Sequence, residues 1–241
     1  MKRIFPSAFR LCFALSILAL PTLAQSNFYK LSIGGGAGIT QSFTEVKKHA
    51  FGIGGYGSLD YMFTPFLSLG LEAQIGQING GDYQTDPGNK QFTNSYKAVS
   101  ANGKIYLGSI IDNDYSSLYN TIKGLYIAGG IGKMKNDVTY VVPVETENTS
   151  YFAQRTSPSS SIFFPVNLGI NFYFANSAGF YRYAVNINYQ ANITLNEYMD
   201  GYNDSQVTFT GGNPDIYTFL SVGLKYNFGP IGLSRKTFRK Y

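Results

Sequence analysis

The segment FGIGGYGSLDYMF, residues 51–63, contains three glycines with the spacing Gly52-x-Gly54-x-x-Gly57. This spacing is typical of the turn that binds the pyrophosphate of NAD or FAD, provided that a strand ends there and a helix begins behind it. Here the residues around the glycines alternate between apolar and polar or small side chains, which is the period of a β-strand. Since no helix start follows Gly57, the sequence argues against a dinucleotide site and predicts a strand over 51–63.

The only histidine, His49, is the next residue with catalytic potential. Ser42 and Glu45 lie near it in the sequence, and a histidine with a serine and a carboxylate is the set that a barrel enzyme acting on lipid A needs. Sequence spacing defines no triad geometry, so we interpret His49 as a solvated loop residue and expect no enzymatic activity. One histidine, with a single cysteine in the N-terminal segment described below, does not make a typical zinc site.

Two acid-rich stretches, DNDY (112–115) and DGYND (200–204), offer the carboxylate and carbonyl oxygens that calcium binds. Neither has the spacing of an EF-hand, and the same residue types also form turns. We therefore expect turns there, with calcium binding as the alternative, and we expect no cofactor.

Residues 1–24 have the pattern of a secretory signal peptide. Three basic residues flank the start of the apolar run 11–20, and the small residues Thr22 and Ala24 follow it, which predicts cleavage after Ala24. The run is too short to cross a bilayer as a helix, which needs about 20 residues. Because Cys12 lies in this segment, the processed chain is expected to contain no cysteine and no disulfide.

The basic character of the chain belongs to its two ends. The formal net charge is +5; residues 1–24 contribute three positive charges and the segment SRKTFRKY (234–241) contributes four, which leaves −2 for residues 25–233. The body therefore has no basic patch for a nucleic acid. We expect residues 229–241 to form a basic periplasmic tail, for which anionic inner-leaflet headgroups or cell-wall polymer are possible contacts.

The period-two alternation recurs along the chain and predicts eight strands. The length of each strand is close to the ~10 residues that a tilted strand needs to cross a bilayer. The strands are expected at 28–39, 51–63, 66–76, 99–108, 123–132, 162–174, 181–190 and 216–228. Long polar connections alternate with shorter ones, as in outer-membrane barrels. The segment 109–122 is long for a turn, and we interpret it as a small amphipathic lid on that rim.

The two faces of the predicted strands indicate which solvent each one meets. No Asp, Glu, Lys or Arg lies on the apolar face of the predicted strands, and all charged residues of the strands lie on the glycine-rich polar face. These charged residues are expected to form an ion-paired network in the lumen: Lys30, Asp60, Glu72, Lys104, Arg182 and Lys225. Glu72 is expected to pair with Lys104, Arg182 or Lys225, and Asp60 with Lys30. Aromatic residues of the apolar face gather near the short turns and predict an interfacial girdle of Tyr29, Tyr61, Phe63, Phe172, Phe174, Tyr181, Tyr183, Tyr226 and Phe228.

The strands NLGINFYF (167–174) and FLSVGLKYNF (219–228) carry a family resemblance. Over residues 28–228 the sequence resembles small outer-membrane β-barrel proteins of the OmpA/OmpX transmembrane type, and in particular the "outer membrane beta-barrel" family common in Bacteroidota. Phe228 is similar to the aromatic residue that ends such barrels, although thirteen more residues follow it here. The resemblance implies insertion by the outer-membrane assembly machinery of a Gram-negative bacterium, among outer-membrane lipid and lipopolysaccharide. It implies no particular activity.

The sequence therefore predicts an all-β fold, an eight-stranded antiparallel up-and-down transmembrane β-barrel over residues 25–228. The expected role is structural or surface interaction, with long extracellular loops and a lumen filled by polar side chains. Three alternatives stay open: a narrow pore or conduit for small or apolar molecules, a lipid-modifying barrel enzyme, and a soluble lipocalin-like secreted barrel whose polar face is outside.

Overall fold

The computed structural model describes residues 26–44, 46, 49–86, 89–111, 117–141, 158–177, 179–195, 199, 215–234, 236 and 238. Its eight strands are β1 (Ser26–Phe43), β2 (Phe51–Thr64), β3 (Leu67–Gly81), β4 (Gln91–Tyr106), β5 (Leu125–Val141), β6 (Ser159–Ala175), β7 (Tyr181–Thr194) and β8 (Ile216–Ser234). The 3-10 turn η1 (Leu107–Ser109) and the short helix α2 (Ser117–Ile122) lie between β4 and β5. No helix in the described part of the chain has the length and apolar character needed to cross a bilayer.

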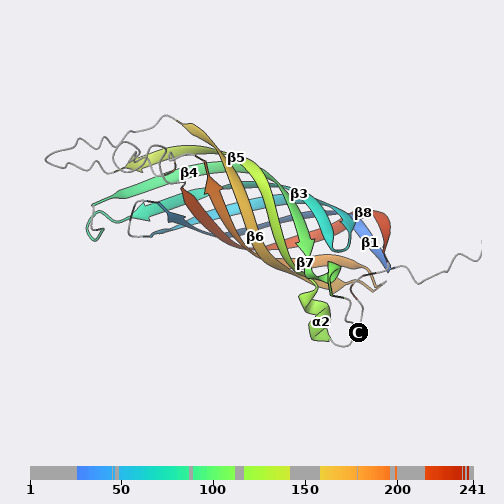
Figure 1. Ribbon diagram of the computed structural model, residues 1–241. Coiled ribbons are helices and arrows are strands. Elements are labelled where there is room, and N and C mark those ends of the chain that lie inside the picture. The colour runs from blue at the N-terminus through green and yellow to red at the C-terminus, as the bar shows by residue number, and fades with distance from the viewer. Residues whose placement is uncertain are drawn as a thin grey trace, which may run out of the picture.

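Each strand pairs antiparallel with the next, and β8 pairs with β1, so the sheet closes into an up-and-down barrel. Because the strands run up and down, β1, β3, β5 and β7 all finish at one end of the barrel, the loop end, and Figure 1 shows α2 at the other, the turn end. The predicted fold class and all eight strands are confirmed.

Several strands are longer than their apolar alternation predicts. β4 begins at Gln91, where the sequence predicts a loop up to residue 98, and β5 continues to Val141. The added residues lie toward the loop end and carry polar side chains on the outer face, including Lys97 and Lys135. The alternation continues through them, but Phe92, Tyr96 and Met134 now form an apolar inner face, so a test that keeps the apolar face on one parity ends too early.

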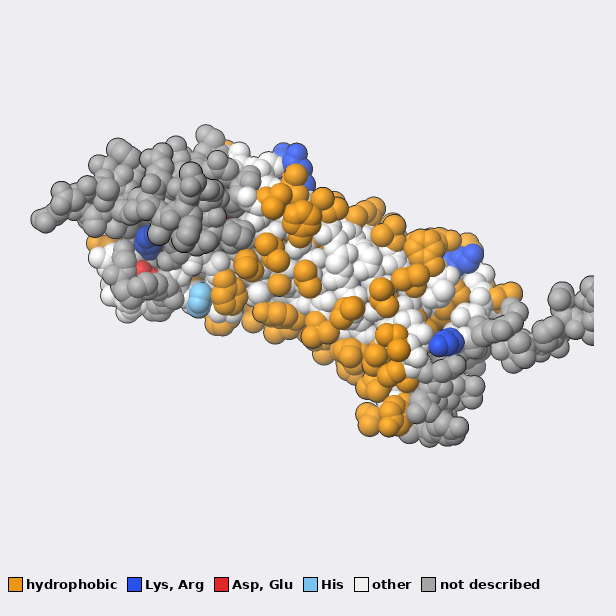
Figure 2. All heavy atoms as spheres, in the orientation of Figure 1, with side chains coloured by type: hydrophobic (Ala, Val, Ile, Leu, Met, Phe, Trp, Pro, Cys, Tyr) orange, Lys and Arg blue, Asp and Glu red, His pale blue; other side chains and the backbone are white. Residues whose placement is uncertain are grey.

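The barrel has its apolar face outside and its polar face inside. Leu71, Val222 and Leu224 are 57%, 55% and 69% exposed, whereas the alternating positions on the same strands point into a buried interior. Figure 2 shows the outward apolar side chains as a band over the middle of the barrel. This is the arrangement of a barrel that faces lipid and the reverse of a soluble lipocalin-like barrel.

The predicted end of the last strand at Phe228 is wrong. β8 continues to Ser234, and a register shift separates the pair Leu31–Phe228 from the pair Tyr29–Ile231. The additional residues on β8 include Gly229, whose φ of +84° suits a glycine in a bulge. The bulge exchanges the two faces, so the outward positions become Ile231 and Leu233, which are exposed.

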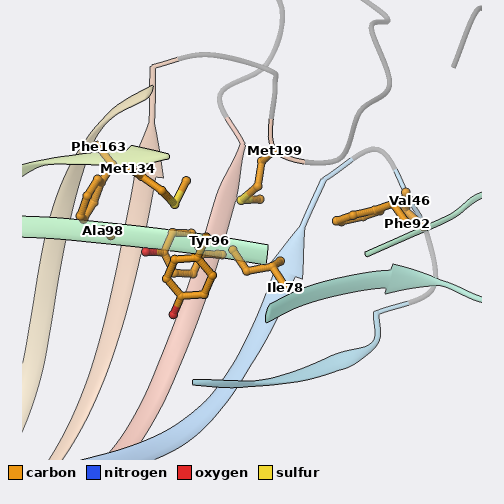
Figure 3. Close-up of a cluster of buried hydrophobic side chains, with 9 residues drawn as sticks. Val46, Ile78, Phe92, Tyr96, Ala98, Met134, Phe163 and Met199 are labelled. Carbon is orange, nitrogen blue, oxygen red and sulfur yellow. The ribbon is translucent and has the colours of Figure 1, made fainter. Parts of the chain in front are cut away.

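The interior is layered along the barrel axis. A loop-end cluster of buried apolar side chains (Figure 3) comprises Val46, Ile78, Phe92, Tyr96, Ala98, Met134, Phe163, Met199 and Tyr217. A turn-end cluster comprises Met62, Phe66, Tyr106, Tyr126, Ala128 and Phe238. Buried charged and amide side chains occupy the lumen elsewhere, so the expected polar filling is present but is combined with apolar clusters that the sequence analysis missed.

The lipid-facing band predicts that an arginine within it destabilises the barrel more than an arginine on an exposed connection does. We expect Leu71→Arg, near the middle of the band on β3, to lower the free energy of unfolding by about 2–4 kcal/mol, because a guanidinium must then be placed in hydrocarbon. Guanidinium titration of the barrel refolded in lipid vesicles measures this change. Tyr83→Arg, on the exposed β3–β4 connection, is the control and should change stability by less than about 0.5 kcal/mol. Equal effects of the two substitutions would contradict the assigned membrane face.

Candidate functional site

The most constrained group of side chains in the lumen is an ion triad centred on Asp60. This carboxylate, on β2, is 1% exposed. Lys104 Nζ donates to Asp60 Oδ1 at 2.7 Å, and Lys225 Nζ donates to Asp60 Oδ2 at 2.8 Å. The triad thus connects β2, β4 and β8 across the lumen and carries a net charge of +1. Buried charges of this kind are tolerated because each has a partner at hydrogen-bonding distance.

Glycine residues provide the space that the triad occupies. Gly70 on β3 lies opposite Asp60 in the register, and a Cβ atom there would be 2.0 Å from Asp60 Oδ1. Gly34 on β1 lies opposite Lys225, and its Cβ would be 2.8 Å from Lys225 Cγ. Glycine at positions 34 and 70 is therefore required by the packing of the charged side chains.

A ladder of amide and phenol groups lies beside the triad. Asn186 Nδ2 donates to Asn171 Oδ1 at 2.8 Å and to the Tyr126 hydroxyl at 3.0 Å. The Tyr126 hydroxyl donates to Asn188 Oδ1 at 3.1 Å, and Asn188 Nδ2 donates to Asn167 Oδ1 at 3.0 Å. Neutral dipoles of this kind satisfy many of the polar groups of a buried interior without adding charge.

Three of the six residues predicted for the lumen network lie together, namely Asp60, Lys104 and Lys225, but the expected pairing is different. Glu72 is buried and accepts a hydrogen bond from Gln74 Nε2 at 2.8 Å. Lys30 is half-buried at the turn end, opposite the β8 bulge, and the prediction that it pairs with Asp60 is wrong. Partners across a barrel depend on register and strand tilt, which single-strand alternation does not contain.

Arg182 does not lie in the lumen. Its guanidinium donates to the Tyr29 hydroxyl at 2.5 Å and to the Tyr226 hydroxyl at 3.4 Å, and its Cζ lies 5.1 Å from the centroid of the Tyr29 ring. The reason is a register shift between β6 and β7, where Phe174 pairs with Tyr183 but Ala175 pairs with Tyr181. Arg182 is the extra residue of this bulge and joins the aromatic residues at the rim, where a cation over aromatic rings is favourable.

The same bulge divides the predicted aromatic girdle. Tyr181 is turned inward and contacts Phe238, with ring centroids 5.5 Å apart, so its assignment to the lipid face is wrong. Five members are exposed on the outer face: Tyr61, Phe63, Phe174, Tyr183 and Tyr226. The remaining three are half-buried: Tyr29, Phe172 and Phe228. Rings of the outer group contact one another, as in the pairs Tyr61–Phe63 at 5.1 Å and Tyr183–Tyr226 at 5.4 Å.

Phe238 is a site residue that the sequence analysis missed. It lies beyond β8, is 8% exposed, and packs on Tyr173 and Phe66 with ring centroids 4.5 Å and 5.1 Å apart. Lys236 Nζ donates to the Ser109 carbonyl at 3.1 Å. These two residues of the predicted basic tail therefore fold back over the turn end of the lumen. Arg235, Arg239 and Lys240 lie outside the described residues.

The other candidate residues are not assembled into a site in the part of the chain that the structure describes. His49 is exposed; its Nδ1 lies 2.8 Å from the Ser42 carbonyl oxygen, while the Ser42 hydroxyl donates to the Asn79 carbonyl at 2.9 Å. The histidine is thus not paired with the serine hydroxyl. Glu45 and the acid-rich stretches 112–115 and 200–204 lie outside the described residues. Among those described, no cluster of three or more His, Cys, Asp or Glu side chains is placed to hold a metal ion.

Comparison with known proteins identifies the family. The model of the outer membrane protein beta-barrel domain matches residues 11–230. The chain belongs to this family. It is therefore a small β-barrel of the outer membrane of a Gram-negative bacterium, and the soluble secreted alternative is wrong.

Solved structures of outer-membrane proteins are similar at low sequence identity. Neisserial surface protein A (NspA) is 12% identical with a TM-score of 0.47, covering 84% of this chain and 99% of its own. Ail, the attachment invasion locus protein of Yersinia pestis, is 12% identical with a TM-score of 0.42, covering 83% and 99%. OprG from Pseudomonas aeruginosa is 10% identical with a TM-score of 0.41, covering 84% and 98%. No curated protein matches the sequence.

The geometry of the ion triad predicts that the stability of the barrel depends strongly on the carboxylate of Asp60. We expect Asp60→Asn to lower the free energy of unfolding by about 3–5 kcal/mol, because two buried lysines lose their counter-charge. The triple variant Asp60→Asn/Lys104→Met/Lys225→Met removes every charge of the triad and should be more stable than Asp60→Asn alone. Denaturant titration in lipid vesicles compares the two. A single variant as stable as the wild type would show that Asp60 is not the counter-charge.

Proposed function

We propose that the protein is a closed, non-conducting outer-membrane barrel with a structural or surface-interaction role. The observation that carries the proposal is the filled lumen, in which apolar clusters near both ends accompany the buried Asp60 triad. An interior of eight strands is about wide enough to be filled by side chains. A pore would need a hydrated pathway, which the filled lumen does not offer. A lipid-modifying enzyme would need a histidine paired with a serine hydroxyl, and His49 is not paired with that of Ser42.

The layers oppose a hydrated pathway for two physical reasons. A permeating ion would meet the turn-end cluster, which includes Phe238, and the loop-end cluster, which includes Met134 and Tyr217, and most side chains of both clusters offer no oxygen ligand. It would also have to displace lysine ammonium groups from the Asp60 carboxylate, which they contact at 2.7 Å and 2.8 Å. The cavity at the turn end, beside Phe238 and Tyr181, has a volume of only about 30 Å³, about that of one water molecule.

A surface role places specificity in the long connections at the loop end. β4 begins at Gln91 and β5 ends at Val141, both beyond the apolar band, so these two strands extend past the lipid at the loop end. Loops that a rigid scaffold carries are where binding residues are usually found. The assembly machinery of the outer membrane is the partner expected for insertion, and no nucleic-acid partner is proposed because the body of the barrel has no basic excess.

Electrical recording tests the closed lumen directly. In planar bilayers at 1 M KCl we expect the purified protein to give no steady single-channel steps, because the lumen is filled along its length. A general porin reconstituted from the same detergent is the positive control for insertion and detection, and protease protection in parallel vesicles establishes that the protein itself has inserted. Uniform ohmic steps that appear with the wild type would contradict this function and favour the narrow pore.

A further inference from the structure

Three lysines interrupt the outer face of the barrel on β4 and β5. Lys97, Lys133 and Lys135 are all exposed, and Lys97 lies directly opposite Lys135 in the register, next to the pair Val99–Lys133. Like charges directly opposite each other in a sheet are destabilising. Asp137 also lies on this face, opposite Ser95 and two residues nearer the loop end, so the group retains an excess of two positive charges. An anion between Lys97 and Lys135 would remove their repulsion.

The apolar band is unusually short where these lysines lie. On β4 the outward positions are apolar or small only from Ile105 to Val99, and on β5 only from Leu125 to Ile131. Six residue steps span about 20 Å along a strand, or about 15 Å of bilayer depth at a tilt of ~40°. The corresponding outward apolar run on β6, from Ile162 to Phe174, is twice as long in residue steps.

The short band places the lysines in the lipid headgroup region. Bacterial barrels have an apolar band of about 25 Å, with the long loops on the extracellular side. The apolar run of about 15 Å is shorter than this band, so the backbone of the lysines that follow it lies below the outer surface of the membrane. Their flexible side chains let the ammonium groups reach the level of the phosphates of the outer leaflet. A charge at this depth is favourable when it meets an anionic headgroup.

An apolar groove lies beside the lysine pair. It has a volume of about 610 Å³, with Ile53, Gly55 and Ile75 among its apolar and small lining residues. Its charged lining residues are Lys97, Lys135 and Asp137. Gly55, Ile75, Lys97 and Lys135 form one continuous register row across β2, β3, β4 and β5. A Cβ atom at Gly55 would have its nearest neighbour, the Gly36 carbonyl oxygen, at 3.6 Å, which is ordinary contact. Barrel packing therefore does not require glycine at this position, and its small size keeps the groove open.

We propose that this surface binds a phosphorylated, acylated lipid of the outer leaflet. The phosphate lies between Lys97 and Lys135 with Lys133 one step away, and an acyl chain lies in the groove over Gly55 and Ile75. Charge complementarity selects the phosphate, and the apolar floor next to it selects a lipid over a free anion. The site is on the outer wall, so it holds whether or not the lumen conducts.

Native mass spectrometry of the purified barrel in a non-ionic detergent tests the proposal. The probes are diphosphorylated lipid A, the same lipid after removal of its phosphates, and inorganic phosphate. We expect the wild type to retain one diphosphorylated lipid A and to bind both other probes at least tenfold more weakly. K97Q/K135Q should lose at least tenfold in affinity for the diphosphorylated lipid, because two charge-assisted contacts are removed.

Two further variants separate the charge from the groove. Gly55→Leu adds an apolar side chain on the lipid face, keeps all three lysines, and should weaken lipid binding severalfold by filling the groove. Lys90→Gln removes one charge from the β3–β4 connection at the same end, outside the groove residues, and should leave binding unchanged. Far-UV circular dichroism and heat-dependent gel mobility verify that each variant is folded.

Specific outcomes would overturn the assignment. Binding of K97Q/K135Q equal to that of the wild type would show that the lysines are not the phosphate site. Equal binding of the dephosphorylated lipid would show that the surface recognises only acyl chains, and inorganic phosphate binding as tightly as the lipid would show that the groove plays no part.

Discussion

The whole structure depends on one constraint: hydrocarbon offers no hydrogen bonds to the backbone. A membrane-spanning sheet with free edges would leave a row of N–H and C=O groups unpaired, each at a cost of several kcal/mol. The chain removes both edges by pairing β1 with β8, from Leu31–Phe228 to Phe43–Ile216 and, beyond the bulge, down to Ser26–Ser234. The alternation of side chains then has only one arrangement compatible with lipid, with apolar residues outside.

Closure also creates the interior that must be filled. Polar residues excluded from lipid are confined to a lumen too narrow for bulk water, so they have to satisfy one another. Asp60 neutralises one of its two lysines, the amides of Asn171, Asn186 and Asn188 bond to one another or to Tyr126, and apolar side chains lie toward each end. The closed lumen proposed above thus arises from the same constraint that defines the lipid face. At the lysine pair Lys97 and Lys135 on the outer wall, charged side chains interrupt that apolar face.

The number of strands and the identity of their two faces could be predicted because both depend on local alternation. Asp60, Lys104 and Lys225 were assigned to the lumen for the same reason, since a charge on the other parity would face lipid. Their partnership could not be predicted, because it joins β2, β4 and β8 and depends on register. Three errors have a common cause. At Arg182 and at Gly229 a bulge exchanges the two parities, so the sequence places Arg182 inside and Tyr181 outside and ends β8 six residues early.

Other features left little signal in the sequence. Phe238 is one of two aromatic residues among the charges of SRKTFRKY, and only the folding of the chain over the turn end shows that it packs on Tyr173 and Phe66. In the loop-end extensions of β4 and β5 the alternation of apolar and polar residues continues with its faces exchanged. Phe92, Tyr96 and Met134 point inward, and the outward positions are polar. A prediction that keeps the apolar face outside therefore ends both strands too early. Lys97, Lys133 and Lys135 consequently fell in segments predicted to be loops, and their place on the outer wall became visible only in the structure.

Residue-resolved amide hydrogen exchange of the barrel in lipid tests closure of the β1–β8 seam most directly. If the seam is paired as in the interior of a sheet, amides of residues 31–43 and 216–228 should exchange as slowly as those of the β3–β4 pair. Exchange at the seam that is orders of magnitude faster than at β3–β4 would show an open edge between the first and last strands and would contradict the account.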